Sequence, residues 1–361
     1  MTIPILATAA ALVLGAAATS RTAALDAAVD TAAAQGLAGE VLACDLERTT
    51  YSRVISAPGR PHQAGELWRW ASVTKQLAAT LVLQEVAAGR LSLEDSVERR
   101  LPSFHGPTAG RITLKMLLQH TSGLANPDDT PAASADAMPA FYLRRSSGVG
   151  GAKDALGFCA SPPKAEPGKG FAYNNCDTIV LGAILERATG KSFASLLRER
   201  ISQPLGLRTL RMAESSKREP ATVRGLTETG APEPPFVLAS FGPAGAAFGA
   251  AEDLLAVDRA LLTNRLLTPE ASRLAWTGDP RLGYVALGAW GFKAKLKGCA
   301  GGPVELVERR GEIGGVEVRN LLAPGLGRAL VIFADKAGLP FGEIWQGAGL
   351  TFDLGSAAFC Q

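Results

Sequence analysis

The chain has 361 residues, of which 47% are hydrophobic and 20% charged, and its formal net charge is +3 at pH 7. This length and composition allow a large hydrophobic core, in one big domain or two interlocked ones. A charge this small, without any block of like charges, argues against binding to nucleic acid or to an anionic membrane surface.

The first segment, residues 1–20, contains no charged side chain and ends in small residues. Such a segment is typical of a secretory signal peptide, and we expect cleavage near Ala18 or Ser20 and a periplasmic or secreted protein. The alternative is that the segment is retained as a membrane anchor, and we expect membrane contact only in that case. Residues 21–361 are predicted to form a single domain.

The N-terminal part of this domain carries both helix and strand signals. Residues 21–36 have the spacing of an amphipathic helix that ends at a glycine. Residues 39–54 predict two short strands. A largely apolar helix is predicted from about Ser72 to Ala88, and Gly89 would end it.

The middle of the chain is mostly helical. Residues 177–201 predict two helices separated by Gly190, and residues 250–264 predict another helix. Residues 131–139 are small and polar, and we expect them to form a surface loop.

From about Leu282 onward the pattern changes to strands. The predicted strands lie within residues 283–296, 303–311, 314–323 and 328–336. Helix and strand at each end of the chain predict a sheet built from the N- and C-terminal segments. The sheet part would comprise about residues 21–85 and 282–361, and a mostly helical part would comprise about residues 86–281.

The five cysteines are Cys44, Cys159, Cys176, Cys299 and Cys360. Export would permit disulfides, and an odd count leaves at least one thiol unpaired within the chain. Cys159 and Cys176 bracket a loop containing proline, lysine and glycine and are the first candidate pair. Cys299 with Cys360 is the second. The alternative is that all five are small buried thiols.

A serine and a lysine, Ser72 and Lys75, stand at the start of the apolar helix in the segment WRWASVTKQ. Residues i and i+3 of a helix are neighbours, so the ammonium is expected beside the hydroxyl. A lysine in an apolar setting can accept the proton of a serine nucleophile, or it can tune another base. The alternative is a serine cap with a solvated lysine, which the apolar residues on both sides disfavour.

The segment FAYNNCD places Tyr173 and Asn175 before a long helix. Lowering a tyrosine pKa from about 10 to near 7 requires roughly 4 kcal/mol. One positive charge about 4 Å away, at an effective dielectric near 20, supplies about that much. Lys75 could therefore turn Tyr173 into a phenolate base. The alternative is that these residues only cap the helix and fill the core.

A third motif, RRGEIGG at residues 309–315, interrupts a strand pattern. Its glycines would let a substrate lie close against a sheet edge, and Arg309 would offer a fixed positive charge to a substrate carboxylate. The alternative is a glycine-rich hairpin with a surface arginine.

Other kinds of site have little support. The segment TGKS at residues 189–192 lacks the first glycine of a P-loop, and no G-x-S-x-G surrounds a serine. The three histidines, His62, His105 and His120, form no H-E-x-x-H motif. We therefore expect no metal and no cofactor, and we interpret His120 as structural.

Several segments, taken together in chain order, resemble the serine β-lactamase and penicillin-binding superfamily: SVTK, ITLKMLLQHTSGL, YNN, ISQPLGL, PAGAAFGAAEDL and RRGEIGG. The most similar branch includes class C β-lactamases, D-Ala-D-Ala carboxypeptidases, D-aminopeptidases and related esterases. The resemblance covers nearly all of residues 21–361. It implies an α+β fold of the β-lactamase/transpeptidase type, with an antiparallel sheet flanked by helices and a mostly helical middle subdomain.

The resemblance also implies a role for individual residues. Ser72 would be the acylated nucleophile, Lys75 its proton-handling neighbour and Tyr173 the general base. Asn175 would hydrogen-bond Lys75 and a substrate amide.

The third motif of this branch is usually His-x-Gly or Lys-Thr-Gly, where this chain has Arg309, Arg310 and Gly311. The oxyanion hole would use the backbone N–H groups of Ser72 and Glu312. Arginine keeps the positive field but cannot trade protons near neutral pH. This departure argues against typical β-lactam and D-Ala-D-Ala turnover more than against acyl transfer. A one-residue slip would place Arg310 in the same position.

The sequence therefore predicts a serine hydrolase that acts through an acyl-enzyme on an ester or amide carbonyl. A β-lactam, a D-amino-acid peptide and a carboxylic ester all stay open as substrates, so the expected partner is a small molecule or short peptide. The alternative function is that of a catalytically impaired fold that binds peptidoglycan-type peptides or a partner protein.

Overall fold

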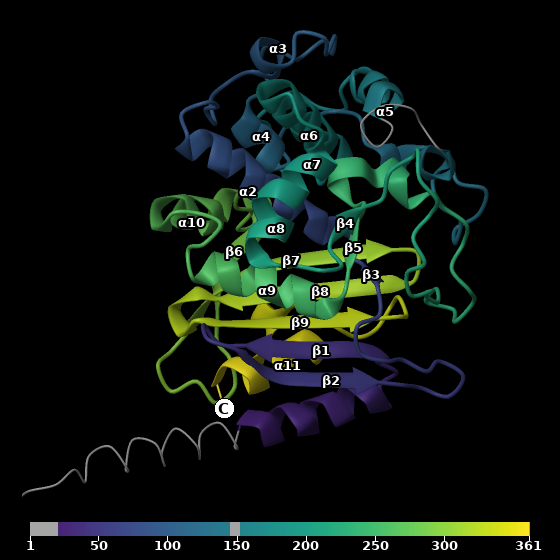
Figure 1. Cartoon of the computed structure of the whole chain (residues 1–361), viewed down its shortest axis with the longest axis vertical. Helices are drawn as coiled ribbons and strands as arrows, with labels where there is room; N and C mark the ends of the chain where they lie inside the picture. Colours follow the sequence, from purple (N-terminus) through teal and green to yellow (C-terminus); the bar gives the residue numbers. More distant parts are fainter. Residues whose placement is uncertain (1–20, 145–151, 361) are drawn as a thin grey trace, which may run out of the picture.

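A computed structural model of the chain describes residues 21–144 and 152–360. The signal peptide predicted for residues 1–20 lies outside these described residues. Within them, no helix has both the length and the apolar character that crossing a membrane requires. Figure 1 shows a sheet in the lower half of the molecule and most of the helices in the upper half.

The main sheet has six strands, all antiparallel, in the order β2-β1-β9-β8-β7-β6. The strands are β1 (Gly39–Cys44), β2 (Thr49–Ile55), β6 (Trp290–Ala294), β7 (Val304–Ile313), β8 (Val316–Ala323) and β9 (Arg328–Ala334). The N-terminal hairpin pairs with the last strand, so the two ends of the chain complete one sheet. The predicted α+β class, with its antiparallel sheet and helical middle, is confirmed.

Helices cover both faces of this sheet. On one face, the helical residues 21–34 and α11 (Leu350–Cys360) pack on side chains such as Val41 and Ile332. On the other face, α9 (Ala251–Leu262) packs on β1 and β9. Two covered faces explain why β9 is apolar almost throughout, without the alternation of a half-exposed strand.

The helical half consists mainly of short helices around two longer ones. Its helices are α2 (Thr74–Ala87), α3 (Val97–Arg100), α4 (Leu114–Leu118), α5 (Ala152–Cys159), α6 (Asn175–Thr189), α7 (Phe193–Leu197), α8 (Gln203–Leu205) and α10 (Pro269–Trp276). The longer helices α2 and α6 pack against each other, and both are buried along most of their length. A helix buried on all sides has no polar face, so α2 is largely apolar.

A second, small sheet lies between the two halves (Figure 1). Its strands are β3 (Trp68–Arg69), β5 (Ala247–Gly249) and β4 (Arg211–Met212), in the order β3-β5-β4. It fixes the segment that leads into α2, which matters for the site described below.

Some predicted boundaries are wrong. The helix predicted from Ser72 has a 3-10 turn, η1 (Ala71–Val73), before α2 begins at Thr74. The strand predicted over residues 283–296 begins only at Trp290, because Tyr284 and Gly288 have φ values of +65° and +83°. These left-handed conformations turn the chain before the strand starts. The helices α5, α10 and α11 are not among the predicted elements.

Candidate active site

Ser72 lies in a turn that is held between the small sheet and the main sheet. The N–H of Trp70 donates to the carbonyl of Ala247 at 2.9 Å, which ties the turn to β5. Ala71 has a φ of +46°, a left-handed conformation that is rare for residues other than glycine. Ala71 is fully buried, whereas Ser72 is only half-buried. The strained turn thus brings the serine from the core to the edge of a cleft.

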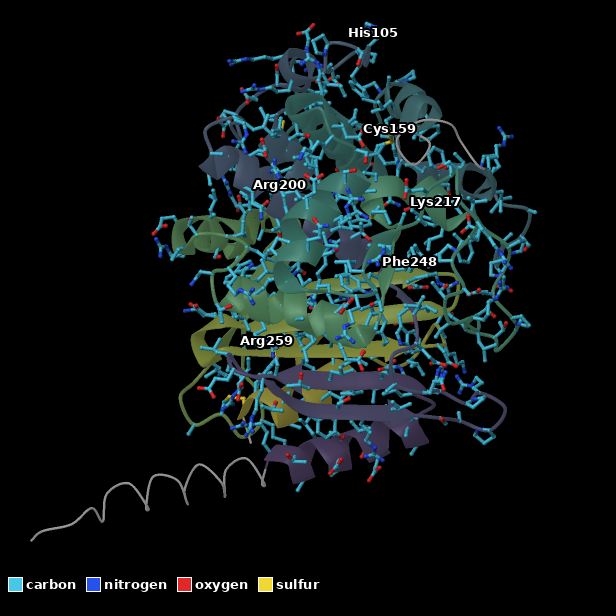
Figure 2. All side chains as sticks on the ribbon, viewed as in Figure 1. His105, Cys159, Arg200, Lys217, Phe248 and Arg259 are labelled. Carbon is cyan, nitrogen blue, oxygen red and sulfur yellow. A yellow bond between two sulfur atoms is a disulfide. The ribbon has the colours of Figure 1, made fainter. Side chains whose placement is uncertain are left out.

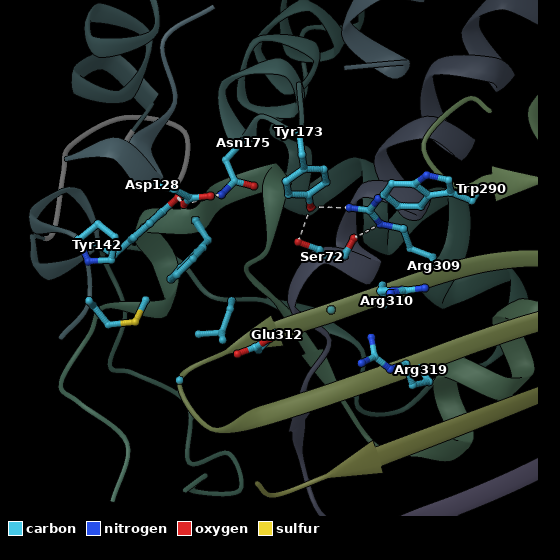
Figure 3. A pocket seen from close by; sticks show the side chains of 16 residues that line it. Ser72, Asp128, Tyr142, Tyr173, Asn175, Trp290, Arg309, Arg310, Glu312 and Arg319 are labelled. Atoms are coloured by element: carbon cyan, nitrogen blue, oxygen red, sulfur yellow. Dashed lines mark hydrogen bonds between the residues drawn. The ribbon is translucent and has the colours of Figure 1, made fainter. Parts of the chain in front are cut away.

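Three side chains singled out in the sequence meet at this turn, and Figure 3 shows two of them, Ser72 and Tyr173. Lys75 Nζ donates to Ser72 Oγ at 3.0 Å. The phenolic oxygen of Tyr173, from the segment just before α6, is hydrogen-bonded to the same Oγ at 2.7 Å. One hydroxyl therefore contacts both a cation and a phenol, although Tyr173 is 101 residues away in the chain.

Lys75 is fixed by three acceptors. Besides Ser72, its ammonium donates to Asn175 Oδ1 at 2.6 Å and to the carbonyl of Ala244 at 2.8 Å. An ammonium group has three protons, so all are used. The neighbouring Asn174 has a different task, since its Oδ1 caps α6 by accepting from the N–H of Cys176 at 2.8 Å.

Arg309, on β7, completes the charge pattern of the site. Its Nη2 donates to the Tyr173 oxygen at 2.6 Å, and its Nε donates to the carbonyl of Ser72 at 2.8 Å. The guanidinium also lies 5.2 Å from the ring centroid of Trp290. Because Arg309 is only 1% exposed, its charge acts on the tyrosine and is not presented to a substrate carboxylate.

Arg310 does not occupy this position. Its guanidinium forms ion pairs with Glu308 and Glu343 and leaves the tyrosine to its neighbour. The alternative register considered for the motif, with Arg310 beside the nucleophile, is therefore wrong.

The two cations change the proton affinity of the phenol. Burial, the largest influence, would raise the pKa of Tyr173, but Arg309 and then Lys75 lower it below the ordinary value of 10.0. The pKa of Lys75 is lowered as well, first by burial and also by Arg309. The phenolate is thus favoured beside a permanent charge, and Arg309 contributes more to this effect than Lys75, to which the sequence analysis assigned it.

Gly311 lets β7 approach the nucleophile's turn. A Cβ at this position would lie 2.7 Å from the carbonyl oxygen of Trp70 and 2.9 Å from the backbone nitrogen of Ser72. Any side chain would therefore push the strand away. The next residue, Glu312, lines the cleft. This proximity is compatible with an oxyanion hole formed by the N–H groups of Ser72 and Glu312, which stays a prediction.

A buried polar cluster supports Tyr173 from behind. The ring of His120 lies 4.6 Å from the tyrosine ring, and its Nδ1 is 2.9 Å from Asp177 Oδ2. Ser122 donates to the other oxygen of Asp177. Burial, followed by Arg309 and Lys75, lowers the pKa of His120 well below 6.5. His120 thus packs against the phenol without adding a charge, in agreement with a structural role.

The cleft in front of Ser72 has a volume of about 500 Å³. Its wall includes two residues that the sequence analysis did not identify, Asp128 and Tyr142. Neither belongs to a recognisable motif, and both come from the segment between α4 and α5, which has little regular structure. The other lining residues are Met138, Pro139, Asn175, Phe241, Trp290, Arg310, Ile313, Gly314 and Arg319, together with the site residues already described.

In the part of the chain that the structure describes, no group of three or more His, Cys, Asp or Glu side chains could hold a metal ion. The arrangement around Ser72 instead contains the parts that acyl transfer needs: a hydroxyl, a base beside it and fixed positive charge.

Two disulfides are present. Cys159 is joined to Cys176, and Cys299 to Cys360, while Cys44 is a buried free thiol. Figure 2 shows Cys159 in the helical half. The first disulfide links α5 to the first turn of α6, next to Asn175, and thus braces the segment that carries the site.

Comparison with known proteins shows a match between residues 23–336 and the family model described as Beta-lactamase. Esterase EstB of Burkholderia gladioli is 30% identical over 281 residues, covering 65% of this chain and 67% of the esterase. Penicillin-binding protein 4 of Amycolatopsis lactamdurans is 31% identical over 212 residues, covering 56% of this chain and 52% of that protein. The chain thus aligns with only about half of the penicillin-binding protein.

Solved structures give the same fold over nearly the whole chain. A D-stereospecific amidohydrolase from Streptomyces sp. has a TM-score of 0.75 at 25% identity, covering 94% of this chain and 98% of that one. A D-amino acid amidase from Ochrobactrum anthropi SV3 has a TM-score of 0.76 at 21% identity, with coverages of 93% and 98%. The second likeness supports the fold alone.

Proposed function

Because the chain belongs to the Beta-lactamase family, we propose that it is a serine hydrolase that forms an acyl-enzyme on Ser72. The observation that carries this proposal is the contact of a single hydroxyl with both Lys75, at 3.0 Å, and Tyr173, at 2.7 Å. A serine hydroxyl is a weak nucleophile until an adjacent base takes its proton, and this arrangement supplies such a base.

In the proposed reaction, the phenolate of Tyr173 takes the proton of Ser72 as Oγ attacks the carbonyl carbon of the substrate. The electron pair of the carbonyl moves to its oxygen, where the N–H groups of Ser72 and Glu312 would stabilise the charge. Collapse of this intermediate breaks the bond to the alcohol or amine, which leaves with the proton from Tyr173. Ser72 is then esterified.

Water completes the cycle. It gives a proton to Tyr173 while its oxygen attacks the ester carbon, and Ser72 Oγ leaves and takes that proton back. Lys75 stays hydrogen-bonded to Ser72 and Asn175 and holds the positive field on the reacting oxygen. Arg309 adds a second positive charge, which keeps the phenol acidic.

The acyl donor is proposed to be an ester or an amide. Esterase EstB supports the ester, and the D-stereospecific amidohydrolase supports the amide. A β-lactam is the least supported donor, because Arg309 stands where the resemblance leads us to expect histidine or lysine.

The proposal is tested by intact-mass measurement after treatment with a fluorophosphonate, followed by hydrolysis assays on an aryl ester, a D-amino-acid amide and a chromogenic cephalosporin. We expect one adduct on the wild type, none on Ser72→Ala, and an unchanged adduct on the control Ser103→Ala, which alters an exposed serine. A folded wild type that forms no adduct and hydrolyses none of the three compounds would support the alternative of a binding protein.

We also propose that the protein works outside the cytoplasm, in the periplasm or as a secreted protein. The support is the pair of disulfides, Cys159–Cys176 and Cys299–Cys360, because such bonds persist mainly in oxidising compartments. Cell fractionation with N-terminal sequencing of the mature protein tests this, and a full-length reduced protein in the cytoplasm would contradict it.

A further inference from the structure

Asn175 has no free hydrogen-bond donor to offer a substrate. Its Oδ1 accepts from Lys75 at 2.6 Å, and its Nδ2 donates to Tyr142 Oη at 2.7 Å and to Asp128 Oδ1 at 3.0 Å. An amide nitrogen carries two hydrogens, so both are used. The substrate-amide contact that the resemblance implied for Asn175 is therefore not available in this structure.

The carboxylate of Asp128, which binds Asn175, offers the cleft a hydrogen-bond acceptor. The side chain is exposed and lines the cavity in front of Ser72. Its hydrogen-bond partners are the hydroxyl of Tyr142 at 2.5 Å, the amide of Asn175, and Asn126 Nδ2 at 3.4 Å. These partners are all uncharged, so among the described residues the carboxylate has no cation bound to it.

Two arginines that line the cleft already have carboxylate partners. Arg310 is bound to Glu308 and Glu343, and Arg319 is bound to Glu317. The neighbouring acid Asp129 points away and pairs with Lys164 at 2.5 Å. Glu312 also lines the cleft, and among the described residues no cation is bound to its carboxylate or to that of Asp128. Of these two carboxylates, that of Asp128 is the one that contacts Asn175.

This carboxylate is also close to the reaction centre. A single amide group, that of Asn175, separates it from Lys75, which itself contacts Ser72. Figure 3 shows Asp128 and Asn175 on one side of Tyr173, and Arg309 and Trp290 on the other. Asp128 and Ser72 line the same cleft, and an ammonium on the α-carbon of an acyl group is only two bonds from the carbonyl carbon that Ser72 would attack.

We propose that Asp128 binds a primary ammonium group of the substrate, so that the preferred acyl donors are esters or amides of amino acids whose amino group is free. This inference rests on the proposed function of Ser72 as the acylated nucleophile. N-acylated donors are disfavoured, because their acyl oxygen would face a carboxylate and find no free donor on Asn175.

The test compares three esters that differ only at one position: phenylalanine methyl ester, its N-acetyl derivative, and methyl 3-phenylpropanoate. For the better enantiomer, we expect the wild-type kcat/KM for the free amine to exceed that for the other two by roughly 10- to 100-fold, as for one charge-assisted hydrogen bond. The preference should shrink as the pH is raised through the pKa of the substrate's amine.

Variants separate the charge of Asp128 from its contacts. Asp128→Asn should lower the preference ratio to within about threefold of unity, whereas Tyr142→Phe, which keeps the carboxylate, should retain the preference. The control Asp129→Asn changes an acid outside the cavity lining and should leave the ratio as in the wild type.

Three results would overturn the inference: no preference in the wild type, an unchanged ratio in Asp128→Asn, or an equal loss on all three esters. The last result would mean that Asp128 only holds Asn175 and Tyr142 in place. Failure of the proposed function is distinct, because then none of the esters is hydrolysed and Ser72 forms no fluorophosphonate adduct.

Discussion

Arg309 donates from Nη2 to the phenolic oxygen of Tyr173 at 2.6 Å while its Nε holds the carbonyl of Ser72 at 2.8 Å. One buried guanidinium thus touches both the base and the backbone of the proposed nucleophile. Where the resemblance leads us to expect histidine or lysine, arginine supplies a charge that does not titrate near neutral pH. Because this charge persists near neutral pH, Arg309 continues to lower the pKa of Tyr173 there.

Replacing this arginine should change the pH dependence of the enzyme. A base works in its deprotonated form, so the rate rises with pH through the pKa of Tyr173, which Arg309 lowers. In Arg309→Gln that pKa moves back up, and the acidic limb of kcat/KM should shift to higher pH. At pH 7 we expect a loss of about 100-fold, measured with an aryl ester.

Two further variants make this result interpretable. Arg309→Lys keeps a positive charge and should shift the limb less than Arg309→Gln. Arg281→Gln alters an arginine whose side chain is 88% exposed and should not shift it. A limb at the same pH in Arg309→Gln would exclude Tyr173 as the group whose ionisation controls the rate.

Gly311 should tolerate no side chain. In Gly311→Ala the added Cβ would lie 2.7 Å from the carbonyl oxygen of Trp70 and 2.9 Å from the nitrogen of Ser72, so strand and turn must separate. Overpacking of this kind costs about 1–3 kcal/mol of unfolding free energy. Because the strand also borders the reacting atoms, we expect kcat/KM to fall by about 100-fold.

Gly325→Ala provides the matched change, since an added Cβ there meets no atom within 4 Å. Its stability, measured by urea denaturation, should stay within about 0.5 kcal/mol of the wild type. If Gly311→Ala were as active as Gly325→Ala, the close approach of β7 to the nucleophile would have no catalytic role.

A residue of this site was predictable when it lay close to Ser72 in the chain or belonged to a family motif. Ser72 and Lys75 are three residues apart on one helical turn, so their contact follows from helix geometry alone. Tyr173 and Arg309 reach them from 101 and 237 residues away, and only the order of family motifs pointed to them. The sheet of N- and C-terminal strands was predictable from the strand signals at both ends of the chain.

Other parts of the site and fold could not be predicted, because nothing in the neighbouring sequence indicates them. Asp128 lies in a single 3-10 turn, η2 (Pro127–Asp129), within a long connection between helices. Neither periodicity nor motif distinguished it there from its neighbour Asp129. The two-residue strands β3 and β4 are too short to show an alternating pattern. The left-handed turn at Ala71 is imposed by packing, since alanine has no intrinsic preference for it.

Loss of the disulfides should destabilise the protein by different amounts. The Cys159–Cys176 bond spans 17 residues and the Cys299–Cys360 bond spans 61. In the chain-entropy model these loops correspond to about 3 and about 4 kcal/mol of unfolding free energy. Chemical denaturation of the two double serine variants measures both losses.

The two bonds should also differ in their effect on activity. Cys176 follows Asn175 at the start of α6, so removal of the first bond should lower kcat/KM under native conditions. The Cys299–Cys360 bond joins the connection between β6 and β7 to the end of α11, and its loss should affect stability only. Equal activities in the two double variants would show that α6 holds its position without the first bond.

Asp258 gives a prediction about stability that is independent of function. Its Oδ1 accepts from Asn320 Nδ2 at 3.0 Å and from Gln76 Nε2 at 3.4 Å, and among the described residues its Oδ2 has no hydrogen-bond partner. The side chain is fully buried, and this burial raises its pKa from 3.8 to about 8. The folded protein therefore keeps the proton that the unfolded chain releases near pH 4.

The sign of the effect follows from that difference. A group whose pKa is raised on folding contributes stability that is fully present below its unfolded pKa and is lost as the pH rises toward its folded pKa. Between pH 4 and pH 8 the wild type should lose as much as about 6 kcal/mol of this contribution. Asp258→Asn cannot ionise, so its stability relative to the wild type should increase across this range. Urea denaturation at pH 5 and pH 9 measures the difference in unfolding free energy between variant and wild type, and Asp353→Asn, at an exposed position, is the control. If the difference for Asp258→Asn were the same at both pH values, Asp258 would titrate alike in the folded and unfolded states.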